Sequence, residues 1–201
     1  SSHDYHLNRF LYEHFPRGVT FAPLPAPVAP QDLPLAEVEA FSIDDVTTTE
    51  IDDAFSVAQL PGGRLCIGIH IAAPALGVAP GDAVDAAARE RLSTVYFPGG
   101  KITMLPPAAI EAFSLVEGRQ CPAVSRYVEL APDGSIAAQA TRVERVPMAH
   151  NLRHYVLEEV FNETSLAAGR IEHPCGDALA EKRDRAGALE VAGRSWQADG
   201  T

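Results

Sequence analysis

Residues 44–53 contain five carboxylates and no basic side chain. No Lys or Arg occurs between Arg17 and Arg64, so nothing nearby in the sequence neutralises this charge. If the segment packs into a fold, its charges repel, and each must be neutralised by protonation, by a distant Arg or by a bound cation. A hard divalent ion, Mg2+ or Mn2+, is the simplest solution, because such ions prefer carboxylate oxygens.

The order of residues within this acidic segment favours a loop. Neighbouring side chains on a strand point to opposite faces, so Asp52 and Asp53 reach one ion only if the backbone is turned there. The small and β-branched run 46–49 lets the chain double back, so that Asp44 meets both. We therefore expect residues 44–53 to fold around a metal. A solvated acidic turn, whose side chains only cap backbone groups, is the alternative.

The spacing of the acids excludes one metal loop and resembles another. An EF-hand needs oxygens at alternate positions, a central Gly and a Glu at its twelfth position, and this segment lacks them. Ile-Asp, a five-residue gap, an acid, one apolar residue and Asp-Asp-Ala resembles the signature of the ribonuclease II and R (RNB) family of exoribonucleases. The four Asp positions of that signature fall on Asp44, Glu50, Asp52 and Asp53. Glu50 is longer by one methylene group than the family's Asp, which leaves its coordination, direct or through a water, open.

Further segments resemble the family in the same order. Residues 70–72 resemble its His-Ile-Ala-Asp segment, except that Ala73 replaces the acid. Residues 94–99 and 104–106 resemble its Thr-x-Tyr-(Leu/Phe)-Pro and Met-Leu-Pro segments. The likeness covers roughly residues 40–195. It implies an α+β fold, in which a mixed sheet with hairpins is surrounded by helices.

Turn residues and hydrophobic periodicity predict where these elements lie. Two hairpins are expected around the turns Pro61-Gly62-Gly63 and Pro132-Asp133-Gly134. Asp82 is placed to cap the helix that follows it. We expect helices at residues 5–15, 83–92, 151–161 and 176–196.

The same patterns divide the chain into three parts. Residues 1–21 form a helical segment, compatible with the end of an upstream domain, and the Pro/Ala-rich residues 22–36 form an extended linker. Residues 37–201 resemble the N-terminal half of an RNB catalytic domain. The resemblance therefore implies a partner, namely the remaining C-terminal half of that domain.

Two tyrosines match aromatic positions of the family. The resemblance implies that Tyr96, on a loop, stacks on an RNA base and that Tyr155 positions the terminal nucleotides. Stacking suits an enzyme that accepts any sequence, because every base offers a π-face. From the residues alone, Tyr96 is equally an ordinary half-buried tyrosine, and a lone residue such as Tyr155 on an apolar helix face is more often part of the core.

The activity that the resemblance implies is hydrolytic 3′→5′ degradation of single-stranded RNA to nucleoside 5′-monophosphates. Asp44, Asp52 and Asp53 are the expected catalytic residues, and with Glu50 they are the expected ligands of two divalent ions. A degenerate RNB-like module that binds RNA or a protein without cleaving is the alternative. A third and less favoured hypothesis is an unrelated acidic metal-binding domain.

The charge and composition limit the class of protein. The formal net charge is -11, and residues 1–63 carry two basic and ten acidic side chains, which concentrates acidity around the acidic segment. No basic cluster marks a phosphate-binding face. No segment is apolar for long enough to cross a membrane, no signal peptide is visible, and three scattered Cys form no disulfide framework. We therefore expect a cytoplasmic protein that does not enter a membrane.

Overall fold

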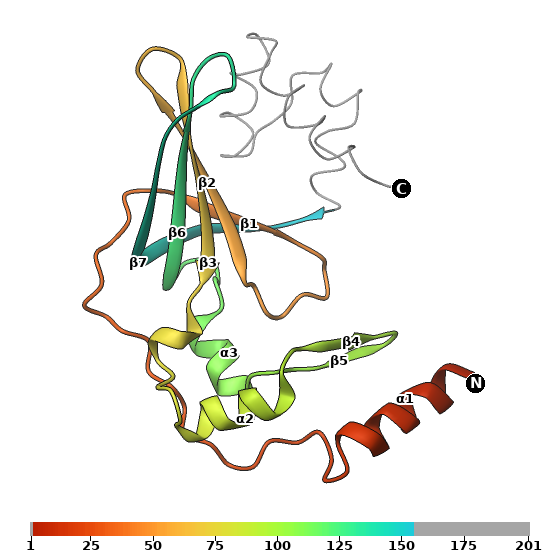
Figure 1. Ribbon diagram of the computed structural model, residues 1–201. Helices are drawn as coiled ribbons and strands as arrows, with labels where there is room; N and C mark the ends of the chain where they lie inside the picture. The colour runs from red at the N-terminus through yellow and green to blue at the C-terminus, as the bar shows by residue number, and fades with distance from the viewer. Residues whose placement is uncertain (1, 155–201) are drawn as a thin grey trace.

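A closed five-stranded barrel is the centre of the computed structural model, which describes residues 2–154 (Figure 1). Its strands follow the order β1-β2-β3-β6-β7, and the barrel closes where β7 pairs with β1 in parallel. All the other pairs are antiparallel. The barrel strands are β1 (Ala40–Asp44), β2 (Asp53–Leu60), β3 (Arg64–Ala72), β6 (Gln120–Leu130) and β7 (Ile136–Arg153).

Both expected hairpins are present. Strands β2 and β3 pair from Asp53↔Ile71 to Leu60↔Arg64 around a turn in which Gly62 and Gly63 adopt positive φ angles of 79° and 76°. Only glycine adopts such angles without steric cost. Strands β6 and β7 pair around a second turn, in which Asp133 accepts hydrogen bonds from the backbone and hydroxyl of Ser135 at 3.0 and 2.7 Å. The α+β fold expected from the sequence is thus confirmed.

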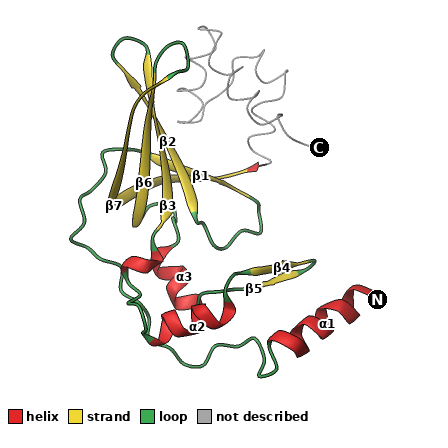
Figure 2. Ribbon diagram, in the orientation of Figure 1, coloured by secondary structure: helices red, strands yellow, loops and turns green. Residues whose placement is uncertain are grey.

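The smaller elements gather at one end of the barrel (Figure 2). Asp82 caps α2 as expected, because its carboxylate accepts the backbone N–H groups of Val84 and Asp85, each at 2.8 Å. Helix α3 was not among the expected helices. These elements are α1 (Ser2–His14), the 3-10 turn η1 (Pro74–Leu76), α2 (Ala83–Arg91), β4 (Val95–Phe97), β5 (Gly100–Ile102) and α3 (Pro107–Phe113).

Two sequence-based placements were wrong. Tyr96 lies on strand β4 of a two-stranded hairpin, not on a loop. Residues 151–153, expected to begin a helix, continue β7, because Leu152 pairs with Ile43 of β1 where the barrel closes. The helix expected at residues 176–196 lies outside the described part of the chain.

An apolar cluster fills the barrel end that faces the helices. Ile51 and Leu115, from two different connections, are 6% and 0% exposed and pack there together. Burial of such side chains provides most of the driving force for folding. The cluster comprises Ala36, Ala40, Ile51, Ala54, Leu115, Cys121, Ala123, Val146 and Met148.

A second part of the interior is polar. The His70 ring, fully buried, forms hydrogen bonds through Nδ1 to Ser125 Oγ at 2.8 Å and through Nε2 to Ser56 Oγ at 2.9 Å. A Cβ atom added at Gly68 would come within 2.3 Å of Ser56 Oγ and 2.7 Å of the ring, so the glycine leaves room for the histidine. The Tyr127 hydroxyl donates to Glu144 beside it at 2.6 Å. Buried polar groups are stable when they are paired in this way.

Candidate metal and RNA site

The acidic segment is the connection between β1 and β2. Asp44 is the last residue of β1 and Asp53 is the first of β2. Because these strands pair antiparallel, with Phe41 opposite Phe55, the end of one and the start of the other lie next to each other. The chain therefore doubles back between Asp44 and Asp53, as the sequence predicts, while the convergence of these carboxylates on a metal stays a prediction.

The position of this connection is fixed by Ile51. Its side chain is in the apolar cluster, its N–H lies 3.4 Å from Ser114 Oγ, and its carbonyl accepts the Leu115 N–H at 3.0 Å. The next carbonyl, of Asp52, accepts the Ala72 N–H at 2.8 Å. These contacts anchor the connection between β1 and β2 to the segment around Leu115 and to the end of β3.

The electrostatics of Asp52 reflect crowding of negative charge. Partial burial of its carboxyl group raises the pKa of Asp52, and the negative charges of Glu50, Asp53 and Asp44 raise it further. The positive charge of Lys101 opposes this shift. A bound cation would favour the charged carboxylate in the same way that Lys101 does.

Asp44 is held by a chain of hydrogen bonds from the end of β7. The Asn151 side-chain N–H donates to Ser42 Oγ at 2.9 Å and to the Leu115 carbonyl at 2.9 Å. The Ser42 hydroxyl in turn donates to Asp44 Oδ2 at 2.5 Å. This chain fixes the orientation of one carboxylate and leaves its other oxygen for a ligand.

Glu50 is engaged by a lysine from the β4–β5 hairpin. Lys101 Nζ lies 2.7 Å from Glu50 Oε2, and the two side chains are 26% and 10% exposed. Sequence reasoning missed Lys101, as it missed Ser42 and Asn151. A signal was present, because Lys101 is the only lysine between residues 1 and 154 and follows the Tyr-Phe-Pro segment after two glycines.

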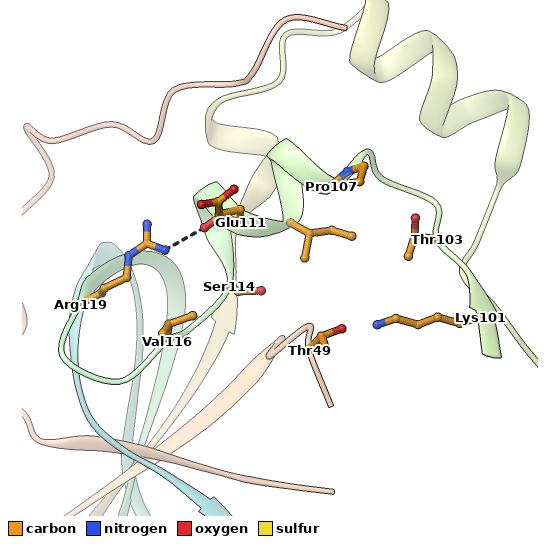
Figure 3. Close-up of a pocket in the computed structure, with 9 residues that line it drawn as sticks. Thr49, Lys101, Thr103, Pro107, Glu111, Ser114, Val116 and Arg119 are labelled. Carbon is orange, nitrogen blue, oxygen red and sulfur yellow. Dashed lines mark hydrogen bonds between the residues drawn. The ribbon is translucent and has the colours of Figure 1, made fainter. Parts of the chain in front are cut away.

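A cavity of about 520 Å³ opens beside this ion pair. Figure 3 shows Lys101 extended towards Thr49, the residue before Glu50, at one side of the cavity. At the other side Arg119 donates to the Glu111 carbonyl at 2.8 Å. The cavity therefore has a cationic group on each side and the acidic segment at its edge.

The donor chemistry fits a hard divalent ion, but the side chains do not form a finished ligand set. Among the residues that the structure describes, no three His, Cys, Asp or Glu side chains come together as a metal-binding group. Asp44, Glu50, Asp52 and Asp53 are nevertheless close enough for the other three to perturb Asp52. Carboxylate oxygens are the ligands that Mg2+ and Mn2+ prefer.

Of the two tyrosines expected to bind RNA, Tyr96 lies within the described residues and Tyr155 does not. Tyr96 is 70% exposed on β4, so its ring is available for stacking. Tyr155 lies just beyond the described residues. Within those residues no helix is long and apolar enough to span a membrane.

Comparisons with known proteins identify the family of the chain. The RNB domain family matches residues 32–153. The chloroplastic/mitochondrial ribonuclease II of Arabidopsis thaliana is 42% identical over 103 residues, which are 51% of this chain and 13% of that protein. Such relatives define the class, a family of RNA-degrading nucleases. The chain belongs to the RNB domain family.

Solved structures share the fold. Mycoplasma genitalium RNase R in complex with ribose-methylated single-stranded RNA matches with a TM-score of 0.65 at 18% identity, over 76% of this chain and 23% of that one. Yeast Ssd1, a pseudonuclease, matches with a TM-score of 0.65 at 20% identity, over 71% of this chain and 19% of that one. The chain spans less than a fifth of the length of the curated relatives it matches.

Proposed function

We propose that this chain carries the metal-binding part of a 3′→5′ exoribonuclease that hydrolyses single-stranded RNA to nucleoside 5′-monophosphates. Within an RNB domain, Asp52 lies in the negative field of Glu50, Asp53 and Asp44 at the β1–β2 connection, which supports a cation site there. A segment with this charge is stabilised by a divalent cation.

The chain's own residues have distinct roles in this proposal. The ligands of Mg2+ or Mn2+ are Asp44, Asp52 and Asp53. Ser42 orients Asp44 through a hydrogen bond, and Glu50, next to these ligands, forms an ion pair with Lys101. A bound divalent ion supplies Lewis-acid activation of water and of the phosphate.

RNA contacts come from the aromatic residues. Tyr96 stacks on a base, which contributes about 1 to 3 kcal/mol and is largely independent of sequence. Tyr155 positions the terminal nucleotides. The remaining C-terminal half of the catalytic domain is the proposed partner, since the chain's net charge of -11 leaves phosphate binding to other groups. We place this activity in the cytoplasm.

The test is degradation of a 3′-tailed single-stranded RNA. The full chain, alone and with the C-terminal half of a related catalytic domain added, is incubated with Mg2+ or with EDTA. We expect mononucleotides in Mg2+ and none in EDTA. The nuclease activity should fall by about a hundredfold or more in Asp53→Asn, because a metal ligand contributes at least as much as the groups that orient it.

Asp45→Asn is the matched control for that experiment. Asp45 lies in the same acidic run, but its side chain is exposed and lies outside the family's signature. The control variant should retain activity. If Asp53→Asn kept its activity within a few-fold of the unsubstituted chain, the proposed function would be wrong.

A non-catalytic RNA-binding module is the second candidate. The described residues do not present a finished metal-ligand group, and a pseudonuclease shares the fold. RNA binding that survives loss of the carboxylates, with no cleavage in any combination, would favour this candidate.

A further inference from the structure

Tyr96 and Lys101 are opposite each other in the β4–β5 hairpin. Directly opposite residues of an antiparallel pair project from the same face, so the exposed tyrosine and the lysine share one side of this hairpin. The lysine extends from that face to the acidic segment, where its Nζ meets Glu50. The hairpin's aromatic side chain is thus linked to the proposed metal site through one lysine.

The ion pair between Lys101 and Glu50 is more enclosed than the ion pair between Arg64 and Glu129. Its side chains are 26% and 10% exposed, whereas those of Arg64 and Glu129 are 43% and 32% exposed. Ion pairs that are partly withdrawn from water are less screened and hold a more defined geometry than exposed ones.

Separate hydrogen bonds fix the two chain ends of the β4–β5 hairpin. The Thr94 hydroxyl oxygen accepts the Met104 N–H at 3.1 Å, and the Arg91 guanidinium of α2 donates to the Thr103 carbonyl at 2.9 Å. These bonds hold the two chain ends where the hairpin begins and ends. Lys101 supplies a contact farther along the strand, with a residue 51 positions away in the sequence.

We propose that the Glu50–Lys101 ion pair is a brace that fixes the β4–β5 hairpin, and with it Tyr96, against the acidic segment. Lys101 is then a positioning residue for single-stranded RNA, and Glu50 serves the brace instead of directly binding metal. This inference rests on the proposed function, because it assigns a use to Tyr96 in RNA binding.

The test measures binding of a fluorescent single-stranded RNA to the full chain in EDTA, where no cleavage occurs. Lys101→Met and Glu50→Gln should each weaken binding by about tenfold, which is part of what one stacked base contributes. Lys101→Arg, which keeps the charge, should bind nearly as well as the unsubstituted chain. Arg64→Met, which breaks an exposed ion pair between β3 and β6, is the matched control and should not change binding.

A double-mutant cycle separates positioning from a simple charge effect. If Lys101 acts through Tyr96, Lys101→Met should have almost no further effect in a Tyr96→Ala background. Hydrogen exchange of residues 94–103 should be faster in Lys101→Met and unchanged in Arg64→Met. Should Lys101→Met fail to fold, Glu50→Gln tests the same contact from the other side.

Each result has a defined meaning. The brace would be overturned if Lys101→Met bound RNA as tightly as the unsubstituted chain. It would also be overturned if Lys101→Met weakened RNA binding as much in the Tyr96→Ala background as in the unsubstituted chain. If Tyr96→Ala itself bound RNA normally, the RNA-binding role in the proposed function would fail with it. A silent Lys101→Met beside an impaired Tyr96→Ala would overturn the brace alone.

Discussion

The Ser42 hydroxyl donates to Asp44 Oδ2 at 2.5 Å, from a position at which Ser42 itself is completely buried. Asn151, at the end of the barrel's last strand, donates to the same hydroxyl oxygen. The parallel pairing that closes the barrel, in which Ser42 is opposite Asn151, therefore also orients a carboxylate of the candidate site.

Ser42→Ala should weaken metal binding through Asp44. Groups that orient a ligand typically contribute about 10- to 100-fold in metal affinity, and the lost hydrogen bond to a charged group lowers the free energy of unfolding by about 1.5 to 3 kcal/mol. Calorimetric Mg2+ titration and urea unfolding measure the two effects. Ser135→Ala, which removes a serine–aspartate bond on the exposed β6–β7 turn, should leave the metal affinity unchanged.

Truncation of Ile51 should loosen the acidic segment. Ile51→Val should lower the free energy of unfolding by about 0.5 to 1.5 kcal/mol, because the side chain is buried in the apolar cluster. Ile136→Ala, at an exposed position on β7, should cost much less. If Ile51→Val and Ile136→Ala lowered the free energy of unfolding equally in urea, Ile51 would not anchor this connection.

Asp52→Asn should change stability in opposite directions with and without metal. The pKa of Asp52 is raised in the folded chain, so its charged form opposes folding as the pH rises through that pKa. Removing the charge should therefore stabilise the metal-free chain at neutral pH, by no more than about 1 kcal/mol because the carboxyl group is only partly withdrawn from water, which screens its charge.

The same variant should lose the stabilisation that Mg2+ gives. A ligand that binds only the folded state raises the melting temperature as its concentration rises. Melting curves with and without MgCl2 should therefore diverge for the unsubstituted chain and for Asp45→Asn, but coincide for Asp52→Asn. An Mg2+ response retained by Asp52→Asn would exclude Asp52 as a ligand.

His70 should make the fold less stable in weak acid. Burial lowers the pKa of His70, and Glu144 only partly opposes this shift. The unfolded chain therefore binds a proton more readily than the folded chain. The free energy of unfolding is highest above the ordinary histidine pKa and falls as the pH drops through and below it. His70→Gln, which cannot titrate, should show a smaller loss of stability between pH 7 and pH 5 in urea unfolding.

Local patterns predicted the hairpins and the helix cap because the responsible residues lie next to one another. Gly62 and Gly63 select a tight turn, and Asp82 bonds to N–H groups two and three residues ahead. The acidic segment was recognisable for the same reason. Its charge and spacing occur within one short stretch.

Contacts between distant segments could not be predicted in the same way. The apolar spacing that begins at Leu152 is compatible with a helix, but pairing with Ile43 keeps that residue in a strand. The contact of Lys101 with Glu50 depends on where the hairpin packs. Sequence periodicity does not contain that information.

Calorimetric titration of the full chain with Mg2+ measures whether the carboxylates of the β1–β2 connection hold a divalent ion. We predict binding to the unsubstituted chain and to Asp45→Asn, and at least about tenfold weaker binding to Asp53→Asn. Equal affinity in all three proteins, or no Mg2+ binding in a folded chain that still binds RNA, would show that these carboxylates do not form a metal site.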